Sequence, residues 1–119
     1  MGEARTFTGG CHCGQVRYEC TTDLDMVTAC NCSICTKKGL HFTFVPEPQF
    51  QLRAGAESLK EYLFNKRVIH HQLCSECGVD VFALGEKPDG TKVIAVNVAT
   101  IDHIDLSSLT MLPIDGRNR

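Results

Sequence analysis

Tryptophan is missing from this sequence, and only eight of its 119 residues are aromatic. A basic excess is missing too, because 14 acidic residues outnumber 12 lysines and arginines and leave a formal net charge of -2. Proteins that bind nucleic acids need a clustered basic face. The composition therefore argues against a nucleic-acid partner.

Long apolar runs are also lacking. No stretch approaches the roughly 20 apolar residues of a membrane span, and residues 1–7 lack the apolar centre of a secretory signal. Eight cysteines in a short secreted chain would indicate a disulfide framework. This N-terminus instead favours the cytoplasm. We expect a cytoplasmic protein without a membrane partner, whose thiols bind metal.

Helical periodicity is the third absence. No segment of 11 or more residues follows a 3.6-residue period, and no repeat or linker divides the chain. We therefore expect residues 1–119 to form a single all-β domain. Alternating or β-branched segments predict strands at 5–9, 15–20, 24–30, 40–45, 50–53, 59–64, 68–73, 78–84 and 92–99. A short helix capped by Asp105 is expected over 105–109, a loop-like tail over 114–119, and Cys20 in the core.

Three cysteines crowd into the stretch Cys30-Asn31-Cys32-Ser33-Ile34-Cys35. Residues two apart on a strand share a face, so Cys30 and Cys32 can converge, and Cys35 would return from a turn. Structural zinc sites are closed by four protein ligands, whereas catalytic sites keep one position for water or substrate. Three local cysteines without an obvious fourth therefore indicate a catalytic zinc.

Two other interpretations of this stretch remain open. His41 or His70 could supply a fourth ligand and close an inert site of three cysteines and one histidine. The spacing of Cys32 and Cys35 is also that of a thioredoxin-type redox motif, although the expected βαβ setting is absent.

Two cysteine pairs remain, Cys11 with Cys13 and Cys74 with Cys77, and a glycine follows each pair. Four thiolates would complete a closed structural zinc site that joins distant strands. Such a site contributes about 10 to 16 kcal/mol of binding free energy, comparable with the total stability of a domain. We expect its loss to unfold the chain. The spacing alone also permits other pairings, such as the first pair with Cys30 and Cys32.

Three segments carry a resemblance: Gly9 to Tyr18 with Cys11-His12-Cys13-Gly14, Cys30 to Gly39, and Leu73 to Gly78 with Cys74-Ser75-Glu76-Cys77. Together with Asp115-Gly116-Arg117-Asn118, they resemble the glutathione-dependent formaldehyde-activating enzyme family, which includes centromere protein V. The resemblance implies a β-tent fold of small antiparallel sheets stapled by zinc, with two zinc ions per chain. It assigns the structural zinc to Cys11, Cys13, Cys74 and Cys77, and the catalytic zinc to Cys30, Cys32 and Cys35.

The resemblance implies a carbon–sulfur lyase similar to S-hydroxymethylglutathione synthase. Its expected substrate is the adduct of a small aldehyde such as formaldehyde with a thiol, with glutathione as the small-molecule partner. Candidates for proton transfer are His41, His70 and His71, and candidates for neutralising glutathione carboxylates are Lys37, Lys38 and Arg67. The alternative is a non-catalytic, zinc-stabilised binding module or glutathione carrier.

Overall fold

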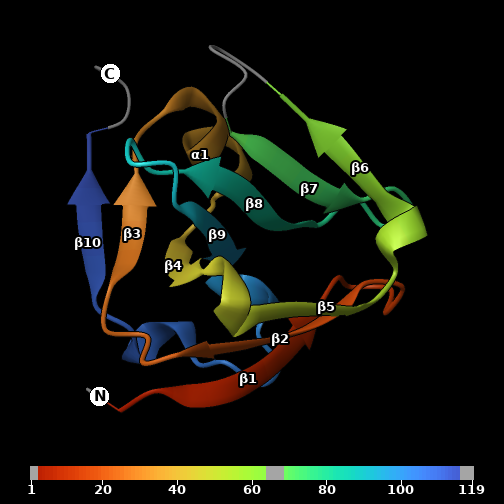
Figure 1. Cartoon of the computed structure of the whole chain (residues 1–119), viewed down its shortest axis with the longest axis horizontal. Coiled ribbons are helices and arrows are strands. Elements are labelled where there is room, and N and C mark those ends of the chain that lie inside the picture. Colours follow the sequence, from red (N-terminus) through yellow and green to blue (C-terminus); the bar gives the residue numbers. More distant parts are fainter. Residues whose placement is uncertain (1–2, 64–68, 116–119) are drawn as a thin grey trace.

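Two β-sheets and one short helix make up the described part of the chain, residues 3–63 and 69–115 of a computed structural model. The smaller sheet has the strand order β1-β2-β5 and the larger β10-β3-β4-β9-β8-β7-β6. Figure 1 shows the smaller sheet along one side of the molecule and α1 on the opposite side. The prediction of an all-β fold built from small sheets is confirmed.

The elements follow one another along the chain, with four 3-10 turns between strands. They are β1 (Arg5–Gly10), β2 (Arg17–Thr22), β3 (Val27–Cys30), α1 (Ser33–Lys38), β4 (Phe42–Pro46), η1 (Glu47–Gln49), β5 (Phe50–Ala54), η2 (Ala56–Ser58), β6 (Leu59–Tyr62), β7 (His70–Cys74), β8 (Asp80–Glu86), β9 (Lys92–Asn97), η3 (Val98–Thr100), η4 (Leu106–Ser108) and β10 (Met111–Ile114). Within these residues no helix is long and apolar enough to cross a membrane.

The main core lies where the two sheets face each other. Phe50 of β5 stacks on Tyr18 of β2 with ring centroids 5.2 Å apart, and it meets Phe82 of β8 at 4.7 Å. Cys20 is fully buried in the same core, and burial raises its pKa to about 11. Its predicted role as a core residue therefore agrees with its surroundings, and its thiol keeps its proton at neutral pH.

The short helix α1 corrects one sequence prediction. We expected Cys35 on a turn, but Ser33–Lys38 is helical and Cys32 is the N-cap residue in extended conformation. A helix of six residues makes fewer than two turns, which is too short to display a 3.6-residue period. Gly39, at φ 65°, ends the helix in the left-handed conformation that glycine adopts easily.

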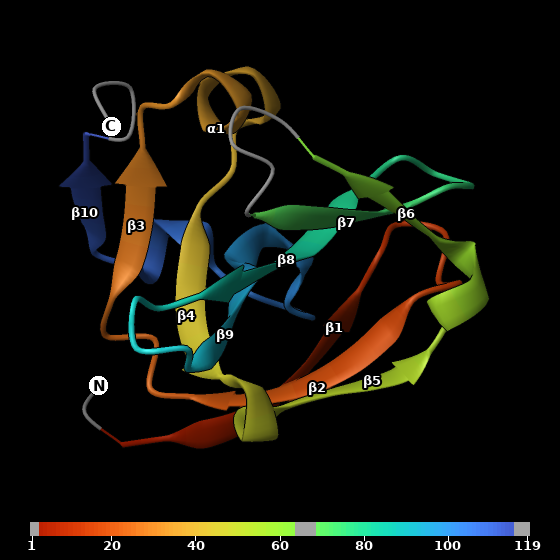
Figure 2. The same ribbon diagram turned by 45° about the horizontal axis from the view of Figure 1, so that its top comes forward.

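Strand β10 corrects a second sequence prediction. Ile114 was placed in a loop-like tail, but Met111–Ile114 pairs with β3, and this pair is parallel whereas the other described strand pairs are antiparallel. Figure 2 shows β10 and β3 side by side with their arrows in the same direction. Four residues with one proline carry too little alternation to predict a strand, so only the long-range pairing reveals it.

Several strand boundaries also moved. The strand expected from Leu24 starts at Val27, because Leu24 has a φ of 59° and leaves the extended region. The strand expected from Gly78 starts at Asp80, after a glycine at φ 81°. Asp105 does cap a short helical turn, where its carboxylate accepts a hydrogen bond from the Ser107 backbone N–H at 3.1 Å. The predicted strand ends at Phe64 and Val68, and tail residues 116–119, lie outside the described residues.

Candidate metal centres

Two groups of cysteine sulfurs lie close enough together to hold a metal ion. We name Cys11, Cys13, Cys74 and Cys77 the clamp site and Cys30, Cys32 and Cys35 the three-cysteine group. Within each group the candidate ligand atoms all lie within 4.8 Å of one another. The eighth cysteine, Cys20, belongs to neither group, and all eight are free thiols.

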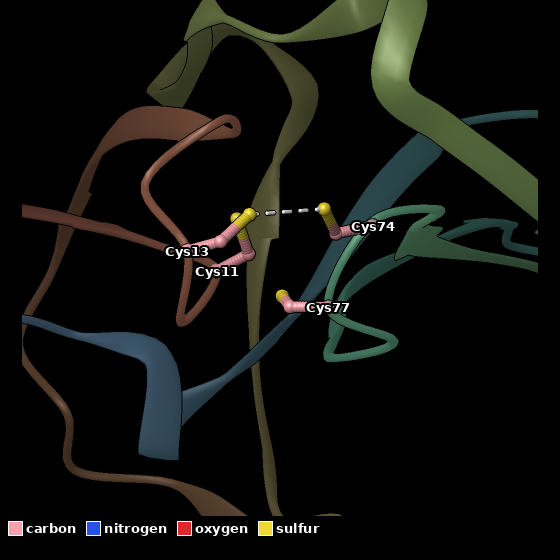
Figure 3. A group of neighbouring side chains, drawn as sticks. All are labelled: Cys11, Cys13, Cys74 and Cys77. Atoms are coloured by element: carbon pink, nitrogen blue, oxygen red, sulfur yellow. Dashed lines mark hydrogen bonds between the residues drawn. The ribbon is translucent and has the colours of Figure 1, made fainter.

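The clamp site is built from two loops of the same kind. Cys11 follows β1, and its backbone N–H donates to the Val16 carbonyl at 3.1 Å, while the Val16 N–H donates to the Cys11 sulfur at 3.3 Å. Cys74 ends β7, and its carbonyl accepts a hydrogen bond from the Gly78 N–H at 2.8 Å. These hydrogen bonds close each loop, and Figure 3 shows the two cysteine pairs facing each other.

The sulfur spacing of the clamp site suits a tetrahedral zinc. Four sulfurs about 2.3 Å from a central ion would lie about 3.8 Å from one another. The Cys11 and Cys13 sulfurs are 3.6 Å apart, and those of Cys13 and Cys74 are 3.7 Å apart. Because Cys11 follows the smaller sheet and Cys74 ends a strand of the larger, an ion here would fasten the two sheets together.

Two thiols of the clamp site, Cys77 and Cys13, have pKa values shifted in opposite directions. Burial raises the pKa of Cys77, but the N–H groups of Val79 and Cys13 and the neighbouring thiols outweigh it and bring this pKa down to about 6. The N–H of Gln15 favours the Cys13 thiolate, yet burial and the three neighbouring sulfurs raise its pKa to about 12. Sulfurs this close cannot all carry charge without a cation between them. A divalent ion would supply that compensation and displace the remaining protons.

The three-cysteine group occupies the junction of β3 and α1. Cys30 is the last residue of β3, Cys32 is the N-cap of α1, and Cys35 lies in its first turn. The backbone N–H of Cys32 donates to the Cys30 sulfur at 3.4 Å. The strand and the helix start thus bring together three sulfurs from six consecutive residues, as the sequence spacing predicted.

Two thiols of this group, Cys32 and Cys35, also differ in acidity. Burial raises the pKa of Cys32, but N–H groups of Cys35 and Ile34 at the start of α1 and the neighbouring thiols outweigh it and lower the pKa. Burial first, and then the neighbouring sulfurs, raise the pKa of Cys35. Cys32 is therefore the thiol of this pair that gives up its proton more easily.

A fourth protein ligand is not found for this group. Among the described residues, no histidine, aspartate or glutamate joins the three sulfurs, and residues 1–2, 64–68 and 116–119 contain none of these residue types and no cysteine. His41 and His70, the alternative fourth ligands, are not in the group. His70 instead pairs with Glu61, its Nδ1 lying 3.0 Å from a carboxylate oxygen. The donor set leaves a position for a further ligand, as open zinc sites do.

The C-terminal segment supports the three-cysteine group from outside. The Asn31 backbone N–H donates to the Ile114 carbonyl, and its side-chain amide donates to the Asp115 carboxylate, both at 3.0 Å. Asn31 lies between Cys30 and Cys32, so these bonds orient the backbone that carries both sulfurs. The remainder of the C-terminal motif, residues 116–118, lies outside the described residues.

A polar cluster around the buried Asp80 and His71 lies beside the other end of α1. The Asp80 carboxylate faces Lys38 Nζ at 3.3 Å and His71 Nδ1 at 3.6 Å. Lys38 and His71 were sequence candidates, but Asp80 was missed. The sequence signal for Asp80 was a single acidic residue in a strand whose two faces are otherwise largely apolar. Of the other candidates, His41 gives its backbone carbonyl to the Val98 N–H, Lys37 lies exposed on α1, and Arg67 lies outside the described residues.

Comparison with known proteins agrees with this architecture. Residues 6–111 match the model of the family described as glutathione-dependent formaldehyde-activating enzyme. The chain is also similar to a Rhodobacter sphaeroides protein of known crystal structure, at 27% sequence identity and a TM-score of 0.78, over 89% of this chain and 97% of that one. The match covers all seven cysteines of the two groups. This chain therefore belongs to the glutathione-dependent formaldehyde-activating enzyme family.

Proposed function

We propose that the chain is a zinc-dependent carbon–sulfur lyase that joins glutathione to formaldehyde as S-hydroxymethylglutathione and also catalyses the reverse reaction. The observation that carries this proposal is the three-cysteine group, which offers three sulfurs and no fourth protein ligand among the described residues. Membership of the family supports glutathione and formaldehyde as the reactants. The free thiols are consistent with the proposed location in the cytoplasm.

The ligand roles are part of the proposal. Cys11, Cys13, Cys74 and Cys77 would hold a structural zinc, and Cys30, Cys32 and Cys35 a catalytic zinc, two ions per chain. A zinc on three cysteines with one open position would lower the pKa of an incoming thiol and present it as a thiolate. Three cysteinates leave such a site with a net charge near -1, which suits a thiol better than the activation of water.

The reaction includes two proton transfers. As the carbon–sulfur bond forms, the thiol loses its proton and the aldehyde oxygen gains one; the reverse reaction returns both. Among the histidine candidates, His71 is buried and its ring lies 6.2 Å from that of Phe42, which packs in the same cluster as the three cysteines. His70 is half-exposed and paired with Glu61. We therefore assign proton transfer to His71.

Exchange spectroscopy tests the lyase. Labelled formaldehyde and glutathione equilibrate slowly without a catalyst, and the rate of their exchange can be followed by NMR. We expect the zinc-loaded protein to accelerate this exchange and Cys32→Ser to abolish the acceleration. A rate equal to that of buffer with the wild-type protein would remove the enzymatic claim.

Chelator titration tests the alternative, a binding module or glutathione carrier. The proposal expects one zinc that a chromogenic chelator removes quickly, from the three-cysteine group, and one that resists. Two equally resistant ions, together with no acceleration of exchange, would favour the module with two structural metals.

A further inference from the structure

A recess of about 270 Å³ lies at the C-terminal end of α1, where it meets the loop before β8. Its lining consists of Lys38, Leu40, Gly78, Val79, Asp80 and Asn97. Leu40 also packs in the cluster that contains Cys30, Cys32 and Cys35. The recess is therefore separate from the three-cysteine group but shares a wall with it.

Asp80 lines this recess and has a side-chain oxygen without a hydrogen-bond donor among the described residues. Its side chain is only 4% exposed, and its Oδ2 faces Lys38 and His71. Its Oδ1 is buried and accepts no hydrogen bond from the described residues. The Asn97 amide donates to the Asp80 backbone carbonyl at 2.8 Å and fixes the start of the strand. A buried carboxylate oxygen without a donor is costly, so this position favours a ligand N–H.

Lys38 brings a positive charge to the same recess. Its side chain is 34% exposed, and its ammonium carries three donors, one of which faces Asp80. A ligand that is only cationic would be repelled by Lys38, and one that is only anionic would be repelled by Asp80. A ligand with an ammonium beside a carboxylate satisfies both side chains.

We propose that Asp80 and Lys38 bind the α-amino carboxylate of the thiol substrate in this recess, with Asp80 Oδ1 accepting from the ammonium and Lys38 donating to the carboxylate. This assignment rests on the proposed function, because it places the substrate sulfur at the three-cysteine group. Cys35 and Lys38 are three residues apart on α1, so their side chains are neighbours on one helix face. The subsite thus lies one helical turn from the sulfurs, within reach of a thiol-bearing amino acid or γ-glutamyl peptide.

Isothermal calorimetry with matched ligands tests the subsite. The probes are glutathione and its analogue with glutaryl in place of γ-glutamyl, which lacks only the α-amino group. We expect the wild-type, zinc-loaded protein to bind glutathione about tenfold more tightly than the analogue, because a charge-assisted hydrogen bond is lost. Asp80→Asn should remove this preference, and Lys38→Met should weaken both ligands. Cysteine as a third probe distinguishes a free amino acid from the peptide.

The control variant is Lys87→Met, which removes a lysine outside the lining of the recess and should keep the tenfold preference. Equal affinity of the wild-type protein for both ligands would overturn the subsite, even if formaldehyde exchange is accelerated. A retained preference without acceleration would leave the subsite standing and remove the lyase instead. Should Asp80→Asn fail to fold, the comparison of ligands on the wild-type protein still decides.

Discussion

Local hydrogen-bond donors and burial set the pKa of individual thiols in this chain, even for cysteines a few residues apart. Cys32 and Cys35 are one helical turn apart, yet backbone N–H groups at the start of α1 help to lower the pKa of the first, whereas burial raises that of the second. Cys20, in the core, keeps its proton because burial raises its pKa. Cysteines of one chain thus range from readily ionised to inert according to local donors and burial.

Replacing one sulfur of the three-cysteine group should separate the two metal centres. We expect Cys32→Ser to lower the zinc content from two ions to about one while the fold persists, because the clamp site is untouched. Elemental analysis gives the zinc content and circular dichroism reports the fold. Cys20→Ala is the matched control, since it removes a buried thiol of neither group and should retain both ions. Two ions in Cys32→Ser would contradict the ligand assignment.

Asn31 should control how firmly the three-cysteine group retains metal. Asn31→Ala removes the hydrogen bond to Asp115 that orients the backbone between Cys30 and Cys32. Residues that orient metal ligands commonly contribute at least about tenfold in metal affinity. We expect a loss of about tenfold at the labile site, measured by competition with a chelator, and little change at the resistant one. Unchanged affinity would show that the C-terminal segment does not support the site.

At the scale of elements, a contact between two loops lies next to the clamp site. The turn at Gly55, between β5 and β6, lies against the loop of the first cysteine pair. Gly55 has a φ of 90°, and a Cβ there would lie 2.2 Å from the Gln15 carbonyl oxygen. Two loops distant in sequence are therefore packed backbone against backbone, directly after the first cysteine pair.

Gly55→Ala should consequently destabilise the protein more than Gly90→Ala. Both glycines have a φ near 90°, but nothing lies closer than 3.8 Å to a Cβ at Gly90. The backbone strain, of about 1 to 2 kcal/mol, is common to both variants, so the difference isolates the steric clash. We expect Gly55→Ala to cost at least about 1 kcal/mol more, measured by chemical denaturation. Equal losses would mean that the two loops separate easily.

For the whole molecule, a zinc ion at the clamp site would link the smaller sheet to the larger. Cys74→Ser should leave three ligands for the proposed structural zinc and yield mostly insoluble or unfolded protein, because an apparent binding energy of about 10 to 16 kcal/mol rivals the stability of a typical fold. Strong chelation of wild-type protein should likewise remove the cooperative thermal transition. A folded, soluble Cys74→Ser with an intact transition would show that the apolar core alone holds the sheets together.

Much of this architecture could be predicted because it depends on local pattern. Cys-x-Cys and Cys-x-x-Cys spacings bring sulfurs together within a few residues, and alternation in segments such as 92–97 marks a strand whatever its partner. Helix α1 was missed because six residues are too few to show a period. Strand β10 was missed because its parallel pairing with β3 joins residues more than 80 positions apart.

The sequence by itself therefore determined the class of fold and the grouping of sulfurs within each short stretch, because these depend on local pattern, and its three cysteine motifs carried the resemblance to the family. The resemblance implied which distant cysteine pairs meet, and only the tertiary structure decided how the C-terminal segment supports the three-cysteine group and where Asp80 lies. A buried carboxylate beside Lys38 arises from the packing of α1 against the start of β8. The spacing of residues along the chain does not predict that contact, since Lys38 and Asp80 are far apart in the sequence and meet only in the folded protein.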